Sequence, residues 1–397
     1  MRISLEVSNS RERMFKELEQ LHSLQEYNKR KIVFFGANIG TELGCLFFQK
    51  RGIDVSCIID NDRLKQGKKV NNVPIASFEN FSEKFYDNAL VFVASSAYEA
   101  MKKQLEEIGY IEKVHIYQIK NFIYQKENEI SKSYKQKGYI PLTLREVQKK
   151  TVEILLYVHE ICEKNSLRYC VAYGSLLGAV RHKGAIPWDD DIDLLMPLQD
   201  FKKFCGIMVE DKNYGIYSAF TSTEDETAIS TLLKVMDMST VAVLNQYPLL
   251  LDGHVGIDVF PLGGYPSDTD EQSQYYLELR EYYQKWNSEI WCNYGTADYQ
   301  YSKQEEMLGV MLSKMERYNY EECEYVGSVA CVPYNPVISK KELFEKRVLL
   351  DYEGKKFYCP SGWHEILQAS YGDFMKYPSE SVRKPSHFYN AHSIVNN

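Results

Sequence analysis

The residues with the clearest potential for chemistry are four aspartates, Asp189, Asp190, Asp191 and Asp193, which lie within five positions and precede the apolar run Leu194–Met196. Carboxylates this close repel one another, so a compensating cation is expected. In an extended strand alternate side chains share a face, so Asp190 is predicted to point away from the other three. Carboxylates on one strand face suit Mg²⁺ or Mn²⁺. The pattern predicts a divalent-cation site, and its alternative is a solvated acidic turn.

The segment before the acids predicts a phosphate site. Residues 167–172 have the pattern of a short strand, which runs into Gly174-Ser175, and residues 176–181 begin a helix. The N-terminus of a helix presents unpaired N–H groups and a partial positive charge, which favour a phosphate. Gly174 and Ser175 are therefore predicted to bind phosphate, and their alternative role is a plain helix cap. A long amphipathic helix over residues 143–164 leads into this segment.

The first half of the chain has a strand, turn, helix and strand pattern. Residues 31–35 are continuously apolar, the turn reads Gly36-Ala-Asn-Ile-Gly40, and the strand over residues 55–59 ends at Asp60. In dinucleotide-binding folds such a turn faces a phosphate and such an acid faces a ribose. Asn38 replaces the middle glycine of that motif. Nucleotide binding at Gly36, Gly40 and Asp60 therefore stays open beside a role in structure, dimerisation or sensing.

Composition sets outer bounds. A chain of 397 residues is long enough for two domains. A net charge of −8 gives no general field for nucleic acid. The charged N-terminal residues do not read as a signal peptide, and the nine cysteines are dispersed, as is typical of reduced thiols. These features predict a cytoplasmic protein with no transmembrane segment and no nucleic-acid partner, and leave peripheral association with a membrane open.

The segment 173–197, YGSLLGAVRHKGAIPWDDDIDLLMP, resembles the signature of the LicD family of phosphotransferases. GIDVFP at 256–261, YEG at 352–354 and YGD at 371–373 resemble later elements of that family, with Gly263 where a second acid often stands. Residues 31–119 resemble a Rossmann-like module attached to bacterial polysaccharide-modifying enzymes. The resemblance implies an α/β protein with a Rossmann-like parallel sheet in residues 1–125, a linker at 126–140 and an α+β nucleotidyltransferase-fold catalytic domain at 141–397.

The resemblance also implies an activity. Family members move a phosphorylated alcohol, such as phosphocholine or ribitol phosphate, from a CDP-activated donor to a hydroxyl of a glycan or lipid-linked glycan. We therefore expect a metal-dependent transferase in the biosynthesis of a cell-surface polysaccharide such as a capsule or teichoic acid. One alternative is a nucleotidyltransferase that attaches NMP to a sugar phosphate or protein. Another is a non-catalytic glycan assembly protein.

The resemblance assigns roles to individual residues. Asp191 and Asp193 are expected as the first metal ligands, with Asp189 as a third. Asp258 is expected to be a distant carboxylate that bridges a second metal or accepts the proton of the attacking hydroxyl. Asp190 is expected to hold a metal ligand or Arg181 in place. Substrate contacts are predicted for Gly174, Ser175, Arg181, His182, Lys234, Arg383 and His387; for Lys234 the alternative is an ion pair with Asp237 or another acid.

Overall fold

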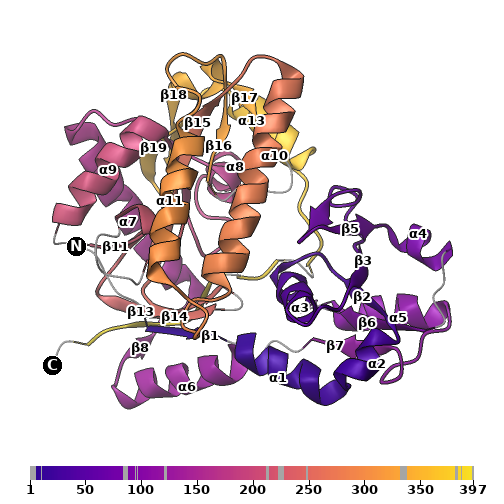
Figure 1. Cartoon of the computed structure of the whole chain (residues 1–397). Coiled ribbons are helices and arrows are strands. Elements are labelled where there is room, and N and C mark those ends of the chain that lie inside the picture. The colour runs from indigo at the N-terminus through magenta and orange to yellow at the C-terminus, as the bar shows by residue number, and fades with distance from the viewer. Residues whose placement is uncertain are drawn as a thin grey trace.

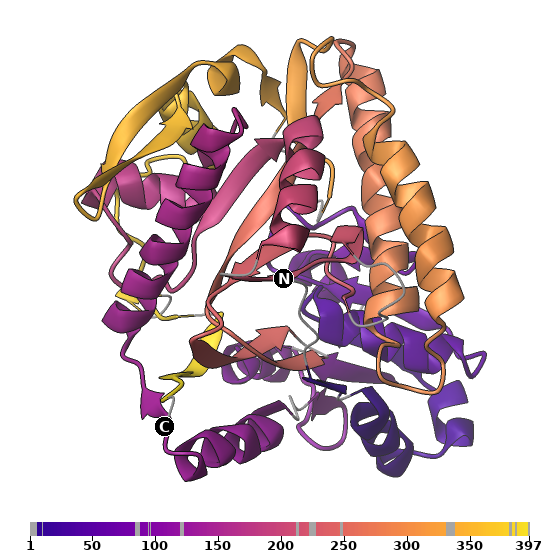
Figure 2. The same cartoon turned by 90° about the vertical axis from the view of Figure 1, so that its left-hand side faces the viewer.

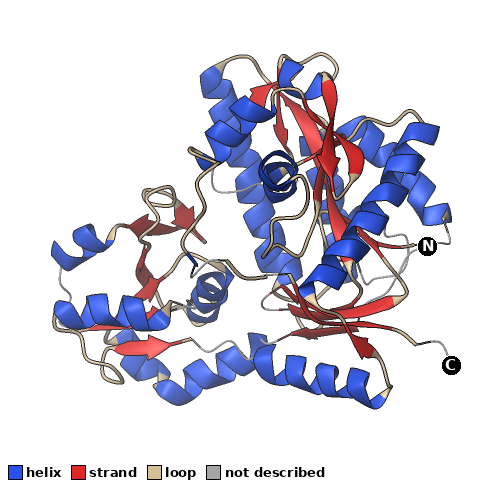
Figure 3. Ribbon diagram, turned by 180° about the vertical axis from the view of Figure 1, so that it is seen from behind, coloured by secondary structure: helices blue, strands red, loops and turns tan. Residues whose placement is uncertain are grey.

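The computed structural model describes residues 6–9, 11–83, 88–93, 95, 97–119, 123–211, 214–221, 228–246, 249–330, 338–380, 383–385 and 387–395. The N-terminal half of the chain forms a lobe beside the larger C-terminal half (Figure 1). Helices cover the sheets of both lobes (Figure 3). Among the described helices, none combines the length and the apolar character that crossing a bilayer would require.

The N-terminal lobe is built on a mostly parallel sheet of order β4-β5-β3-β2-β6-β7. Its central strands are continuously apolar because helices cover both faces. Ile32 and Phe34 of β2 pack on one side of the sheet, while Val33 and Phe35 pack on the other. The predicted strands at 31–35 and 55–59 are confirmed. The elements are β2 (Lys31–Phe35), α3 (Ile39–Gln49), β3 (Val55–Ile59), β4 (Lys69–Val70), β5 (Val73–Ala76), α4 (Phe78–Glu83), β6 (Ala89–Val93), α5 (Tyr98–Glu107) and β7 (Ile116–Gln118).

The helical pattern before β2 forms two helices, α1 (Arg11–Leu21) and α2 (Leu24–Asn28). The break falls at Ser23, whose side chain accepts a hydrogen bond from the Glu26 N–H while the Glu26 carboxylate accepts one from the Ser23 N–H. This capping box begins a new helix, and apolar spacing by itself does not reveal it.

The C-terminal lobe is organised around a second sheet, of order β11-β12-β15-β10-β9, with β16 on β15. Strand β10 runs parallel to β15, while β12 runs antiparallel to it. The predicted amphipathic helix is confirmed as α7, which begins after the capping box of Thr143 and Glu146. The elements are α7 (Leu144–Lys164), β9 (Cys170–Val171), α8 (Tyr173–His182), β10 (Asp193–Pro197), α9 (Leu198–Glu210), β11 (Gly215–Tyr217), β12 (Leu233–Met236), β15 (Gly256–Tyr265) and β16 (Tyr325–Ser328).

A tyrosine-rich helical pair and a late hairpin flank this sheet. Helices α10 (Thr269–Trp286) and α11 (Tyr301–Met315) lie side by side along one edge of the lobe (Figure 2). Tyr275, Tyr276 and Leu279 of α10 are buried in the main core. The remaining elements of this part are β17 (Ser339–Lys340), α12 (Glu342–Glu345), β18 (Arg347–Tyr352), β19 (Lys355–Pro360) and α13 (Trp363–Tyr371).

A third sheet joins distant parts of the chain. Its order is β1-β14-β13-β20-β8, so the first described strand pairs with β14 of the C-terminal half. Helix α6 (Ile123–Gln136) packs on it through Tyr134, which is 1% exposed. The polar run at 126–140 therefore includes a packed helix. The strands are β1 (Glu6–Asn9), β8 (Ile140–Pro141), β13 (Thr240–Gln246), β14 (Leu249–Gly253) and β20 (Phe388–Ser393).

Partly buried polar contacts connect the two lobes. Arg11 Nη2 donates to Asp298 Oδ2 at 2.8 Å, and Asn9 Nδ2 donates to the Cys292 carbonyl at 3.0 Å. Cys292 is buried within the core cluster of the N-terminal lobe. Glu42 of α3 lies close to Arg280 of α10 and is 9% exposed. Burial raises the pKa of Glu42 from 4.5 to about 7, and Arg280 offsets only part of that effect.

Glu42→Gln is expected to stabilise the protein above pH 7 and to have little effect near pH 4. Between pH 4.5 and 7 the unfolded chain releases the Glu42 proton before the folded chain does, so the wild type loses stability as pH rises through this window. The gain of the variant at pH 8 should be about 2 kcal/mol. Thermal and urea unfolding at pH 4.5 and pH 8 measure it. Glu99→Gln, at an exposed carboxylate in the first turn of α5, is the matched control; an equal gain in both variants would contradict this account.

Candidate active site

Three charged side chains stand in a row on neighbouring strands of the C-terminal sheet. Strand register pairs Asp193 of β10 with Asp258 of β15, and Asp258 with Lys234 of β12. Lys234 Nζ donates to both oxygens of Asp258, at 2.5 and 2.7 Å. The predicted partnership of the acidic segment with Asp258 is thus present in space, and the predicted alternative of an ion pair holds for Lys234.

The acidic loop before β10 is not a strand. Strand β10 begins only at Asp193, and residues 189–192 have no regular structure. The expectation of alternating faces is therefore wrong for Asp189, Asp190 and Asp191, because alternation requires extended, sheet-paired backbone. Ligand atoms of these three acids and of His387 lie within 4.8 Å of one another.

Asp190 binds the C-terminal segment of the chain. Its carboxylate is 2% exposed and accepts hydrogen bonds from the His387 N–H at 3.1 Å and from the Phe388 N–H at 2.9 Å. His387 Nδ1 lies 3.0 Å from Asp190 Oδ1 and 3.2 Å from Asp191 Oδ2. Asp190 therefore holds His387 and the start of β20 beside the acids, rather than Arg181.

The acid cluster is electrostatically strained. Burial raises the pKa of Asp191 to about 7, with Asp189 and Asp258 adding to the effect and His387 opposing it. Burial, Asp191 and Asp258 raise the pKa of Asp193 well above its usual range. Burial alone would raise the pKa of Asp190, but the hydrogen bonds from His387 and Phe388 outweigh it and lower that pKa. Burial lowers the pKa of His387, but Asp190 and Asp191 raise it to about 9.

Two side chains to which the sequence analysis assigned no role hold the backbone of the acidic loop, although Glu353 lies in the YEG element at 352–354. Gln148 of α7 is 5% exposed, and its Nε2 donates to the carbonyls of Ile186 and Asp189 at 3.1 and 2.8 Å. Glu353, at the tip of the β18–β19 hairpin, accepts from the Ala185 N–H at 3.2 Å and pairs with Arg145. The signal for Gln148 was its place on the apolar face of an amphipathic helix, where a polar side chain needs a buried partner.

The start of helix α8 faces the acids. Tyr173 has φ of 45°, a left-handed conformation that is strained for a non-glycine residue, and it turns the chain from β9 into the helix. A Cβ on Gly174 would lie 3.1 Å from Asp189 Oδ2, so the glycine lets helix and carboxylate approach. Ser175 Oγ accepts from the Asp193 N–H at 2.9 Å and is turned toward β10. Ala172, at the N-cap, supplies no side-chain acceptor to the first N–H groups.

Arg181, His182 and Arg383 form a separate cluster with Trp188 and Tyr377. Arg181 Nη1 donates to the carbonyl of Phe374 at 2.9 Å, and Arg383 Nη2 donates to that of Pro378 at 2.7 Å. Both guanidinium groups lie over the Tyr377 ring, at 4.9 and 5.5 Å from its centroid. His182 contacts the rings of Trp188 and Tyr377 edge-on. The three basic residues therefore hold the segment after α13 and do not bind the acids directly.

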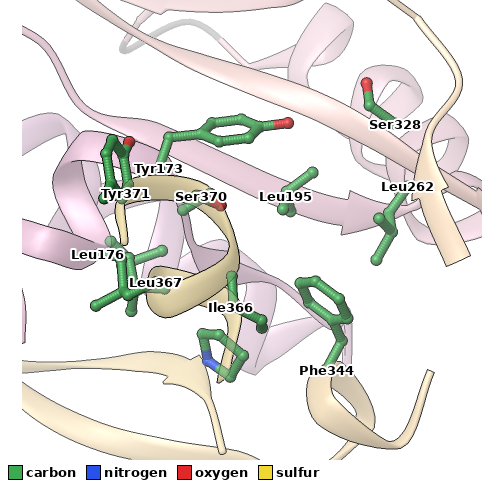
Figure 4. A pocket seen from close by; sticks show the side chains of 13 residues that line it. Tyr173, Leu176, Leu195, Leu262, Ser328, Phe344, Ile366, Leu367, Ser370 and Tyr371 are labelled. Atoms are coloured by element: carbon green, nitrogen blue, oxygen red, sulfur yellow. The ribbon is translucent and has the colours of Figure 1, made fainter. Parts of the chain in front are cut away.

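An apolar pocket lies farther along the same sheet face. Leu195 follows Asp193 by two residues in β10, and Leu262 follows Asp258 by four in β15, so these side chains share a face with the acids. Figure 4 shows Tyr173 and Tyr371 on one side of the pocket, with Ile366 and Phe344 on the other. Burial raises the pKa of Tyr371 to about 12, with Asp193, Asp189 and Asp191 adding to the effect.

In the N-terminal lobe the predicted nucleotide residues bind one another. Asp60 Oδ2 accepts from the Ala37 N–H at 2.7 Å, and Asp60 Oδ1 accepts from the Asp62 N–H at 2.8 Å. Asn38 caps helix α3, accepting from the Gly40 and Thr41 N–H groups at 2.9 and 3.3 Å. Gly36 supplies the positive φ of 100° that the turn requires. The N–H groups and the acid that would face a nucleotide are thus engaged within the turn.

Comparison with known proteins defines the class first. Residues 166–248 match the family described as "LicD/FKTN/FKRP, nucleotidyltransferase domain". This match spans the start of α8, the acidic loop and Lys234, so these residues belong to a domain of nucleotidyltransferase type. Residues 28–116 match a second family, "C2185-like, N-terminal", which covers most of the N-terminal lobe.

The chain is also similar to individual proteins of known name. The chain is 29% identical over 272 residues to "Lipopolysaccharide cholinephosphotransferase LicD" of Haemophilus influenzae, a match that covers 64% of this chain and 99% of that protein. It is 40% identical over 67 residues to human "Ribitol 5-phosphate transferase FKRP", covering 17% of this chain and 13% of FKRP. A match of 39% identity over 85 residues to "Uncharacterized protein RP689" of Rickettsia prowazekii covers 21% and 25%. Over residues 166–248 the chain is thus similar to the LicD family, and the match to the H. influenzae protein extends this similarity to 64% of the chain.

Gln148→Leu is expected to weaken binding of Mn²⁺ about tenfold or more, because a residue that holds a metal ligand in position commonly contributes that much to metal affinity. The substitution leaves the carbonyls of Ile186 and Asp189 without their buried donor and frees the loop that carries the acids. A loss of about 1–3 kcal/mol in unfolding free energy should accompany it. Titration with Mn²⁺ followed by electron paramagnetic resonance measures the affinity. Lys149→Gln, on the exposed face of the same helix, is the control; an unchanged affinity for Mn²⁺ in Gln148→Leu would refute the positioning role.

Proposed function

We propose that this protein transfers a phosphorylated alcohol from a CDP-activated donor to a hydroxyl of a glycan or lipid-linked glycan. The single observation that carries the proposal is the meeting of the α8 N-terminus with Asp189 and of Asp193 with Asp258. The N-terminus of a helix binds phosphate, and a cluster of carboxylates binds a cation. Together they suit a diphosphate with its bound cation. The names of the H. influenzae and human relatives, a cholinephosphotransferase and a ribitol 5-phosphate transferase, support the choice of cargo.

The donor set at the acidic loop fits a hard divalent cation. Oxygen ligands from Asp189, Asp190 and Asp191 converge there, and burial together with neighbouring carboxylates raises the pKa values of Asp191 and Asp193. Asp189, Asp191 and Asp193 would hold Mg²⁺ or Mn²⁺. When bound, such an ion neutralises charge on the diphosphate and orients it.

The other steps of the reaction are assigned to residues of the chain. The N–H groups of Gly174 and Ser175 bind a donor phosphate at the start of α8. Asp258 accepts the proton of the acceptor hydroxyl while the hydroxyl oxygen forms a bond to the phosphorus of the alcohol phosphate. The bond between that phosphorus and the CMP oxygen breaks, and CMP leaves. Phosphoryl transfer of this kind depends on positioning and charge more than on covalent chemistry.

The surroundings suit the two substrates. The pocket between Tyr173 and Tyr371 offers aromatic and aliphatic surface on the same sheet face as the acids, which suits contact with an apolar part of a substrate. Arg181, His182 and Arg383 keep the segment after α13 at the edge of the site, where a glycan acceptor would enter. His387 orders the acidic loop through Asp190 and Asp191.

We assign the N-terminal lobe to a Rossmann-like module and the C-terminal lobe to the catalytic domain of nucleotidyltransferase fold. The boundary then falls after β7, with α6 and β1 on the catalytic side because α6 packs on the third sheet and β1 is one of its strands. The self-contained turn around Asp60 and Asn38 favours a structural or assembly role for the module over nucleotide binding.

The main alternative enzyme attaches NMP to a sugar phosphate or protein and releases pyrophosphate. The same phosphate-binding helix and acids would serve it, so product identity separates the two reactions. A non-catalytic glycan assembly protein is the other alternative, and the retained acids, each held by specific contacts, speak against it.

Incubating the protein with CDP-choline, CDP-ribitol, CDP-glycerol and CDP-ethanolamine plus Mg²⁺ and a glycan acceptor should release CMP from one of them. EDTA should abolish the release, and the double variant Asp191→Ala/Asp193→Ala should lose it by about a thousandfold or more. Chromatography of nucleotides measures CMP, and mass spectrometry of the acceptor measures the added alcohol phosphate.

The control variant is Asp351→Asn, which removes an exposed carboxylate paired with Lys356 on the β18–β19 hairpin and should leave CMP release unchanged. Pyrophosphate release with a nucleotide on the acceptor would replace this proposal by the NMP-transferase alternative. Full activity in the double variant would exclude the acidic site.

A further inference from the structure

Lys234 holds both oxygens of Asp258, the carboxylate that was expected to bridge a second metal ion. Its Nζ lies 2.5 and 2.7 Å from the two carboxylate oxygens of Asp258, and its side chain is 8% exposed. The pairing is built into the sheet, because β12 and β15 place Lys234 and Asp258 at directly opposed positions of an antiparallel ladder. The lysine therefore reaches Asp258 without a flexible loop.

The carboxylates of the site divide between different counter-charges. Asp258 is paired with Lys234, while Asp190 accepts from His387 and Phe388. Asp189, Asp191 and Asp193 remain, with His387 Nδ1 also 3.2 Å from Asp191. These three carboxylates are left to hold a cation, and Asp258 is not among them because Lys234 already compensates its charge.

A second ion on Asp258 would have to displace an ammonium group from both of its oxygens. The displaced group would stay buried between β11 and β15, since the register of β12 fixes its backbone. A buried ammonium without its carboxylate is strongly unfavourable. Asp193, on the other side of Asp258 in the sheet, is free of that constraint.

We propose that the site binds a single divalent cation and that Lys234 acts as its second cation. An ammonium group has three N–H donors, and Asp258 takes two of them, so the third can donate to an oxygen of the donor diphosphate. Lys234 thereby carries charge neutralisation that a second metal ion carries in two-metal sites. This inference rests on the proposed function, because it assigns the lysine to the same diphosphate.

Counting the Mn²⁺ ions bound by the purified full-length wild type tests the proposal. Equilibrium dialysis and electron paramagnetic resonance should give one ion per chain, and Asp258→Asn should keep that ion. Two ions per chain in the wild type, falling to one in Asp258→Asn, would overturn the proposal. No bound ion at all would overturn both it and the metal-dependent function.

The variant Lys234→Met tests whether Lys234, rather than another feature of the site, limits the wild type to one bound Mn²⁺ ion. Without the ammonium group, Asp258 and Asp193 lie side by side uncompensated, so the variant should bind a second, weaker Mn²⁺ ion. A count that stays at one in a variant with wild-type circular dichroism would overturn the role of Lys234. Lys150→Met is the matched control, since Lys150 pairs with Asp237 at 3.1 Å outside the acid cluster, and its count should equal that of the wild type.

The two proposals fail in different ways. One ion in the wild type and two in Lys234→Met, with no CMP released from any CDP donor, would leave the cation assignment standing and remove the donor class. CMP release by a wild type that binds two ions would leave the proposed function standing and remove the role of Lys234.

Discussion

The crowding of carboxylates at the start of β10 is the constraint on which the rest of the C-terminal lobe depends. Five aspartates approach one another there, four from the acidic segment and Asp258 from β15. Burial disfavours the charged forms and the neighbouring carboxylates repel one another, and both effects raise the pKa values of Asp191 and Asp193. A fold that brings them together must supply compensating groups, and this one does so in a different way for each acid.

The compensating groups come from separate elements. A strand neighbour, Lys234, pairs with Asp258, and backbone N–H groups at the start of β20 pair with Asp190. Gln148 and Glu353 hold the backbone of the loop itself, from α7 and from the β18–β19 hairpin. What remains uncompensated faces the N-terminus of α8, whose dipole has the opposite sign. The open negative charge is thus confined to the side where a cation and a phosphate can meet.

In the N-terminal lobe, by contrast, the polar groups of the glycine turn are satisfied within the turn. Its glycine turn and following acid have the order of a dinucleotide site, yet Asp60 and Asn38 satisfy the N–H groups of the turn from within. Partly buried contacts of Arg11 and Asn9 with the segment after α10 connect this lobe to the other. The N–H groups of the turn and Asp60 are thus engaged within the lobe itself.

The local pattern of the sequence was enough to predict several helices and strands and the chemistry of the site. Strands β2 and β3, helix α7 and the turn into α8 follow from apolar periodicity, glycine and capping residues, which act over a few neighbours. The acidic motif and its resemblance to the LicD family also lie within one short segment, and the comparisons support them. Residue types alone thus determined that a cation and a phosphate were the expected ligands.

Only the tertiary structure decided the partners. Asp190 meets His387 across 197 positions of sequence, Arg181 meets Phe374 across 193, and β1 joins a strand more than half the chain away. Strand alternation gave the wrong directions for Asp189 to Asp191, because the sheet begins after them. A side chain's face can be read from local periodicity, but the group that satisfies its charge is set by packing between distant segments, which periodicity does not encode.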